Sequence, residues 1–306
     1  MVSLRMARVL VSGASGLIGS ALLPTLKNSG AQIVRLSRSG SPAPSHDEQL
    51  IQWDPRQPLP ADLVSGFDAV VHLAGESIAG RWTEEKKKRI RDSRVIGTRN
   101  LAQALAQTRR KPQMFICGSA IGYYGDRGDE ILNESSKAGQ GFLPDICREW
   151  EASTQPAIDA GIPTVHLRTG IVLSANGGAL AKMLTPFKLG GGGRIGSGRQ
   201  WMSWIDLQDM VGAIHHMLKN DLTHGPVNMV APKPVTNAEF TTTLASVLSR
   251  PAIFPMPAFA VKLAFGEMGE ALLLGSQRVE PTKLVTGGYP FRFKTLRDSP
   301  ENILKR

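Results

Sequence analysis

The first half of the chain alternates short, almost continuously apolar runs with longer segments in which apolar residues recur every three or four positions. The short runs predict buried strands, and the longer segments predict helices with one apolar face. Strands that are apolar on both faces are typical of a parallel sheet covered by helices on both sides. The expected strands are 9–12, 32–36, 50–53, 69–73, 114–117 and 164–167, and the expected helices are 17–27, 83–106 and 145–160.

The pattern changes after Leu173, where glycine runs and scattered prolines break the chain into shorter segments. A helix is expected at 180–189, and strands at 204–207 and 227–230 flank a further helix at 208–218. We therefore predict an α/β fold: a doubly wound parallel Rossmann sheet with a smaller C-terminal substrate lobe. The predicted Rossmann domain is 6–173, completed by 204–230, and the predicted lobe is 174–203 with 231–306.

A glycine-rich turn joins the first predicted strand to the first predicted helix. The free N–H groups and the positive dipole end of such a helix favour a pyrophosphate. We expect Gly13 to permit the tight turn, Gly16 to let the ligand approach, and Gly19 to let helix and strand pack closely. The predicted pyrophosphate loop comprises Gly13, Ser15, Gly16, Leu17, Ile18 and Gly19.

The residue at the end of the second strand selects between the two nicotinamide cofactors. That strand carries no acidic residue, and Arg38 follows it between Ser37 and Ser39. A guanidinium there can hold a 2′-phosphate, with Ser39 adding a hydrogen bond, so the sequence favours NADP(H). Arg38 is otherwise an ordinary exposed arginine. Asp54 either touches the adenine or serves only as a turn residue before Pro55.

Composition narrows the class of protein. The 306 residues are 42% apolar and 20% charged, as in globular proteins, and no run of about 18 apolar residues predicts a membrane span. The start lacks a secretory signal, and two cysteines are too few for a disulfide framework or a metal site, so we expect a cytoplasmic protein. The net charge is +10, concentrated in 81–99 and 109–111. That excess is either a solvated helix face or an attraction for an anionic ligand, and no motif indicates nucleic-acid binding.

Several segments together resemble the extended short-chain dehydrogenase/reductase family over nearly the whole chain. The resemblance is narrower to an atypical epimerase-like subfamily of nucleoside-diphosphate-sugar epimerases with a C-terminal DUF1731-type module, some of whose members are linked to cell or plastid division. It implies NADP(H) binding at the glycine loop, at Arg38, and along Leu73, Ala74 and Gly75. Arg94 and Arg168 are further candidate cofactor-binding residues. The segments are Gly13–Gly19, Asp68–Glu76, Arg81-Trp82, Ser93–Thr98, Gly122–Asp126, Trp150-Glu151, Leu167–Gly170, Trp204–Asp209 and Gly275–Pro281.

The chain departs from the parent family at the proton-transfer residues. That family uses a Tyr-x-x-x-Lys pair; aligned on the later acidic residue Glu151, its positions hold Leu143 and Cys147 here. Leucine carries no proton and cysteine is not a cation. The family's asparagine position reads Arg94, and its serine position reads Ala120 or, with one inserted residue, Ser119.

Other residues near the expected carboxyl edge of the sheet could take over this chemistry. Tyr123 or Tyr124 could donate the proton, or both could be packing residues with a hydrogen-bonded hydroxyl group. Glu76 could bind a substrate hydroxyl or act as a base, or could form an ion pair with Arg81. Cys147 is either a redox thiol or a buried inert cysteine. The candidate catalytic residues are Tyr123, Tyr124, Ser119 and Glu76.

These features predict an NADP(H)-dependent oxidoreductase or epimerase-like enzyme acting on a polar, anionic small molecule such as a nucleotide sugar. The alternative is an NADP(H)-binding regulatory or sensor protein without turnover, for example in cell division. A homodimer through helices 83–106 and 145–160 is compatible with the family. No nucleic acid or membrane partner is expected.

Overall fold

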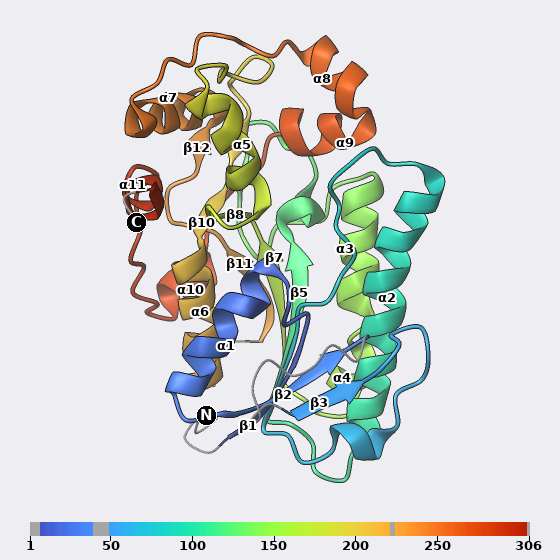
Figure 1. Cartoon of the computed structure of the whole chain (residues 1–306). Coiled ribbons are helices and arrows are strands. Elements are labelled where there is room, and N and C mark those ends of the chain that lie inside the picture. Colours follow the sequence, from blue (N-terminus) through green and yellow to red (C-terminus); the bar gives the residue numbers. More distant parts are fainter. Residues whose placement is uncertain (1–6, 39–48, 221–223, 305–306) are drawn as a thin grey trace.

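The computed structural model describes residues 7–38, 49–220 and 224–304. Seven parallel strands form its central sheet in the order β11-β7-β5-β4-β1-β2-β3 (Figure 1). This confirms the predicted doubly wound parallel sheet. The strands are β1 (Arg8–Ser12), β2 (Gln32–Ser37), β3 (Gln49–Gln52), β4 (Ala69–His72), β5 (Met114–Ala120), β7 (Thr164–Thr169) and β11 (Gly225–Met229).

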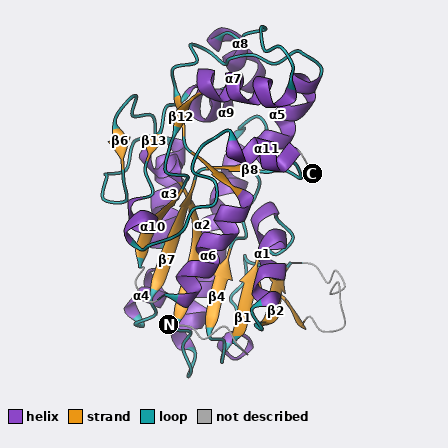
Figure 2. Ribbon diagram, turned by 90° about the vertical axis from the view of Figure 1, so that its left-hand side faces the viewer, coloured by secondary structure: helices purple, strands orange, loops and turns teal. Residues whose placement is uncertain are grey.

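Helices cover both faces of the sheet (Figures 1 and 2). On one face α1 (Leu17–Asn28) packs against α6 (Leu207–Lys219). On the other, α2 (Glu84–Gln107) packs against α3 (Phe142–Ala152) and α4 (Gln155–Asp159). Each face has its own core of buried aliphatic and aromatic side chains. The near-continuous apolar strands are explained by this burial on both sides.

Two sequence predictions differ from the structure. The helix expected at 145–160 is broken, because Ser153 and Thr154 donate their hydroxyl groups to the carbonyl oxygens of Glu149 and Glu151. Pro156 then lies in the first turn of α4, where its missing N–H leaves no helical hydrogen bond unmade. The strand β10 (Trp204–Asp206) pairs with β8 (Ile171–Leu173) instead of entering the large sheet.

The C-terminal lobe lies above the carboxyl ends of the strands (Figure 1). Its core joins side chains from 173–204 with side chains from 231–304. Within the described residues, no helix is long and apolar enough to cross a membrane. The remaining elements are η1 (Ala61–Val64), η2 (Ile121–Tyr124), β6 (Ile131–Leu132), α5 (Gly178–Lys188), β9 (Trp201–Met202), β12 (Val235–Thr236), α7 (Asn237–Leu248), α8 (Ala258–Phe265), α9 (Glu267–Gly269), η3 (Glu270–Leu274), β13 (Arg278–Val279), α10 (Thr282–Thr286) and α11 (Asp298–Leu304).

A buried histidine makes the stability of this sheet depend on pH. His72 on β4 is 1% exposed and hydrogen-bonds Ser12 Oγ at 2.5 Å and Thr98 Oγ1 at 3.1 Å. Burial lowers its pKa from 6.5 to about 4, so the unfolded chain binds more protons between these values. We expect the free energy of unfolding to be highest above pH 6.5 and to lose about 3 kcal/mol as pH falls to 4.

Urea unfolding across this pH range tests the histidine contribution. His72→Gln should flatten the dependence, whereas His224→Gln, at an exposed position, should leave it unchanged. A dependence that is the same in wild type and His72→Gln would remove His72 from the explanation.

Candidate functional site

The glycine loop after β1 is packed tightly against the end of β4. Gly13 has a φ of +71°, and a Cβ atom there would lie 2.6 Å from both the backbone nitrogen of Ala74 and the carbonyl carbon of Leu73. A Cβ on Gly19 would lie 2.2 Å from the carbonyl oxygen of Gly13. Only glycine fits at either position, which brings the first turn of α1 directly onto the loop.

The amino end of α1 is left open toward the surface. Gly16 is its N-cap, and no described side chain caps the helix. The N–H groups of the first turn therefore lack intrahelical partners and point out of the helix end. Ser15 and Gly16 are exposed, while Leu17 and Ile18 are half-buried. Free donors on an uncapped helix behind a close-packed glycine turn fit a pyrophosphate.

Arg38 lies exposed just after β2, beside the ends of the two neighbouring strands. Hydrogen bonds from Arg56 lower the pKa of Asp54 to about 2, and the charge of Arg38 contributes to the same shift. Asp54 is thus already paired with Arg56, whose Nη2 lies 2.7 Å from its Oδ2. Ser39, the other residue predicted to hold a 2′-phosphate, lies outside the described residues.

Arg94 fixes the segment after β4 through hydrogen bonds to backbone carbonyl groups. Its guanidinium donates to the carbonyl oxygens of Glu76 at 3.0 Å and Ile90 at 3.1 Å. It also lies 5.0 Å from the Trp150 ring centre, and burial lowers its pKa. A Cβ on Gly75 would come within 3.4 Å of the guanidinium carbon. Arg94 therefore shapes the loop of Leu73, Ala74 and Gly75.

Glu76 is paired, but with a different cation from the one expected. Lys86 Nζ lies 2.6 Å from Glu76 Oε1, in place of the expected pairing with Arg81. The hydrogen bond from Lys86 lowers the pKa of Glu76, and the charges of Arg89 and Arg38 lower it further. Because the Glu76 side chain is 30% exposed, it remains accessible from the sheet edge.

The basic run of α2 is largely neutralised by nearby carboxylates. This supports a solvated helix face in preference to an anion-binding surface. The pairs are Lys86–Glu76, Lys87–Glu84, Lys87–Glu267, Lys88–Asp92, Arg89–Glu85, Arg91–Asp92 and Arg91–Glu149.

The two positions of the missing Tyr-x-x-x-Lys pair face the turn after β5. A Cβ on Gly122 would lie 3.3 Å from Leu143 Cβ and 3.8 Å from Cys147 Sγ. Leu143 packs with Phe142 and Trp82 in an apolar cluster. Burial raises the pKa of the Cys147 thiol to about 12, so it stays protonated and unreactive at neutral pH.

The two candidate tyrosines have different surroundings. Tyr124 is fully buried; its hydroxyl donates to Asn228 Oδ1 at 2.7 Å and accepts from Arg168 Nη1 at 3.0 Å. Burial raises the pKa of Tyr124. Tyr123 is half-buried, and the guanidinium carbon of Arg168 lies 3.4 Å from its ring centre. Of the two, Tyr123 is the one that reaches the surface.

Ser119 and Arg168 both point into a buried network. Ser119 donates to Glu151 Oε1 at 2.7 Å, and Arg168 binds both oxygens of Glu151 at 2.9 Å. Asn228, which joins this network through Tyr124, was not among the residues predicted from the sequence. Its one local signal is an amide inside the apolar strand 227–230.

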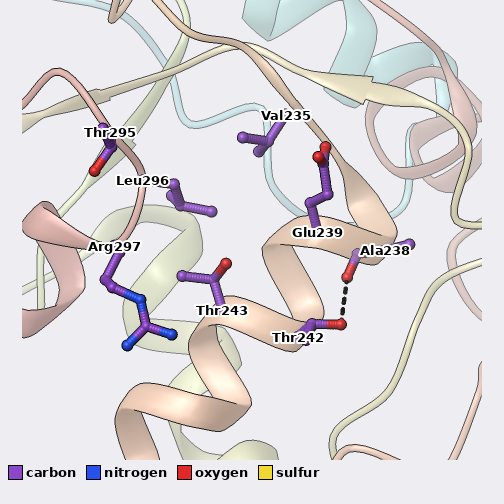
Figure 3. Close-up of a pocket in the computed structure, with 8 residues that line it drawn as sticks. All are labelled: Val235, Ala238, Glu239, Thr242, Thr243, Thr295, Leu296 and Arg297. Carbon is purple, nitrogen blue, oxygen red and sulfur yellow. Dashed lines mark hydrogen bonds between the residues drawn. The ribbon is translucent and has the colours of Figure 1, made fainter.

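A shallow groove of about 480 Å³ lies elsewhere, on the C-terminal lobe (Figure 3). Two of its polar side chains are bonded locally: Thr242 donates to the Ala238 carbonyl, and Arg297 pairs with Glu301. No residue of the glycine loop or the sheet edge lines it, so it is separate from the candidate site. Its lining residues are Val235, Ala238, Glu239, Thr242, Thr243, Thr295, Leu296 and Arg297.

Known proteins share this architecture. An epimerase family protein of Mycobacterium tuberculosis is 41% identical over 295 residues, which cover 96% of each chain. The crystal structure of human epimerase family protein SDR39U1 with NADPH has a TM-score of 0.89 and 35% identity, covering 98% of this chain and 99% of that one. A nucleoside-diphosphate sugar epimerase from Corynebacterium glutamicum has a TM-score of 0.79 and 35% identity, covering 98% of this chain and 58% of its own.

Family models divide the chain in two. Residues 256–303 match DUF1731, a domain of unknown function. Residues 9–230 match the NAD dependent epimerase/dehydratase family, and this range contains the parallel sheet except for its first residue, Arg8, together with the glycine loop. The chain therefore belongs to the NAD-dependent epimerase/dehydratase family and carries a C-terminal DUF1731 domain.

Proposed function

We propose that this protein is an NADP(H)-dependent oxidoreductase or epimerase-like enzyme acting on a polar, anionic small molecule such as a nucleotide sugar. The observation that carries the proposal is the uncapped end of α1 behind Gly13, with Arg38 exposed at the end of the adjacent β2. The human relative crystallised with NADPH and the Corynebacterium protein named as a nucleoside-diphosphate sugar epimerase support it.

The proposed binding residues follow the carboxyl edge of the sheet. The pyrophosphate lies on the loop from Gly13 to Gly19, including Ser15, Leu17 and Ile18, and Arg38 holds the 2′-phosphate. Leu73, Ala74 and Gly75 contact the cofactor's ribose side, with Arg94 holding their loop from behind. When bound, the cofactor supplies or accepts a hydride.

We assign the role of proton donor to the substrate to Tyr123. Tyr124 and Ser119 already donate their hydroxyl protons to Asn228 and Glu151, so using either would break a buried hydrogen bond. Tyr123 is half-buried, lies directly after β5 and is next to the expected ligand edge. Glu76, held as a carboxylate by Lys86, can accept a hydrogen bond from a substrate hydroxyl.

Replacing Tyr123 by phenylalanine tests this assignment. With wild type, we would screen NADPH oxidation against nucleotide-4-keto sugars and NADP⁺ reduction with UDP-glucose, both followed by absorbance. On the substrate that responds, Tyr123→Phe should lower kcat by about 10²-fold or more, because it removes the proton donor. NADPH affinity should stay within about twofold. Full activity in Tyr123→Phe would exclude the assignment.

One observation favours the second candidate function, a cofactor-binding regulatory protein without turnover. At the positions of the family's proton-transfer pair, Leu143 packs in an apolar cluster and Cys147 is a buried thiol. This function predicts a protein partner that is retained on the immobilised chain only with NADPH, or only without it. Partner binding that ignores NADPH would count against it.

A further inference from the structure

A buried ion pair lies directly beneath Tyr123. The side chains of Arg168 on β7 and Glu151 on α3 are only 4% and 13% exposed. Taking two charges out of water is costly, and such pairs often stabilise a fold no better than apolar residues would. A pair retained at the carboxyl edge of the sheet therefore calls for a role beyond stability.

The hydrogen bonds of Arg168 use four of its five N–H groups and leave the faces of its guanidinium uncovered by hydrogen-bond partners. Its Nε and Nη2 donate to Glu151 at 2.9 Å each. Its Nη1 donates to the Tyr124 hydroxyl at 3.0 Å and, more weakly, to the Glu134 carbonyl at 3.4 Å. These contacts direct the N–H groups into the protein, so Arg168 is badly placed to bind a cofactor phosphate.

One free face of this guanidinium lies against Tyr123. The distance from the Arg168 guanidinium carbon to the Tyr123 ring centre is 3.4 Å, and that to the Tyr124 ring centre is 5.2 Å. A cation on the face of an aromatic ring is attracted to it, most strongly where water is excluded. The attraction is stronger still when the ring carries negative charge.

We propose that Arg168, held by Glu151, which in turn accepts a hydrogen bond from Ser119, is the positioning residue that orients Tyr123 and stabilises the negative charge left on it by proton transfer. This rests on the proposed function. In the reduction of a carbonyl substrate with NADPH as hydride donor, the carbonyl carbon gains the hydride and the carbonyl oxygen gains the phenolic proton. Tyr123 then remains a phenolate until a proton from solvent restores its hydroxyl group. Arg168 thereby supplies the cation that Cys147 cannot.

Nitration of Tyr123 by tetranitromethane tests this without any substrate, because the reagent attacks the phenolate form. The chain has three tyrosines, and fragment mass spectra of the intact, folded protein distinguish Tyr123 from buried Tyr124. Arg168→Met should nitrate roughly threefold to tenfold more slowly at Tyr123 than wild type. A role in packing alone predicts the opposite, since losing the guanidinium would expose the ring.

Two further variants keep the test decisive if Arg168→Met does not fold. Arg168→Lys keeps the positive charge but lacks the planar guanidinium, so Tyr123 should be nitrated in it at an intermediate rate. Glu151→Gln keeps the cation and one acceptor, and should stay within about twofold of wild type or react faster. The proposal would be overturned if Tyr123 were nitrated at the same rate or faster in both Arg168 variants. It would also be overturned if Glu151→Gln slowed nitration of Tyr123 as much as Arg168→Met does. Failure of the turnover assay alone would instead reject the proposed function.

Discussion

Gly13→Ala is expected to destabilise the protein by about 3 kcal/mol and to abolish NADPH binding. Part of the cost is the left-handed φ of +71°, which disfavours a side chain. The rest is a clash, since the new Cβ would lie 2.6 Å from the backbone of Leu73 and Ala74. Backbone atoms cannot rotate away as a side chain can, so the loop and the end of β4 must separate. Denaturant unfolding and NADPH fluorescence titration measure the two effects.

Gly128→Ala is the matched control. Gly128 also has a left-handed φ, +55°, but a Cβ there would meet no atom within 4 Å. It should therefore show the conformational cost alone, about 1 kcal/mol, with NADPH affinity unchanged. Equal destabilisation in the two variants would mean that the close packing of the glycine loop on β4 contributes nothing.

Asp209→Ala is expected to cost about 3–5 kcal/mol, because it removes the anchor of the chain segment 289–293 on α6. Asp209 is 1% exposed. Its Oδ1 accepts from the Tyr289 hydroxyl at 3.0 Å and the Arg292 backbone at 2.9 Å, and its Oδ2 accepts from the Phe293 backbone at 2.9 Å. Alanine would leave the backbone N–H groups of Arg292 and Phe293 without this partner, and the Tyr289 hydroxyl with only the backbone carbonyl of residue 209.

The neighbouring residue Gln208 provides the control for this anchor. Its side chain accepts a hydrogen bond from Arg292 at the exposed edge of the same contact. Gln208→Ala should cost less than about 1 kcal/mol by urea unfolding. If Asp209→Ala costs no more than this, the buried carboxylate does not hold the C-terminal segment in place.

Local pattern predicted the fold because each buried strand is a nearly continuous apolar run and each helix has its own apolar periodicity. The glycine loop was equally readable, since a turn followed by a helix needs glycine at fixed positions. The break between α3 and α4 was not, because Ser153 and Thr154 end the helix through side-chain bonds that compete with its ladder. The displacement of β10 depends on pairing with β8, which no local pattern records.

The candidate site was predicted less completely than the fold. The sequence predicts that Ser119, Arg168 and the two tyrosines lie at the sheet edge. It does not predict which side chains they contact there. Those pairings join residues that are 17 to 104 positions apart, so only the folded chain shows that Arg168 faces Tyr123 while binding Glu151. A cytoplasmic location and a homodimer through the segments 83–106 and 145–160 stay predictions from the sequence.

A fluorescence titration of the purified protein with NADPH and, in parallel, NADH tests the central claim most directly. Wild type should bind NADPH at least about tenfold more tightly than NADH, because Arg38 adds charged hydrogen bonds to the 2′-phosphate. Arg38→Ala should remove this preference while leaving NADH binding unchanged. Equal affinity of wild type for the two, or no binding of either, would contradict the assignment of this site to NADP(H).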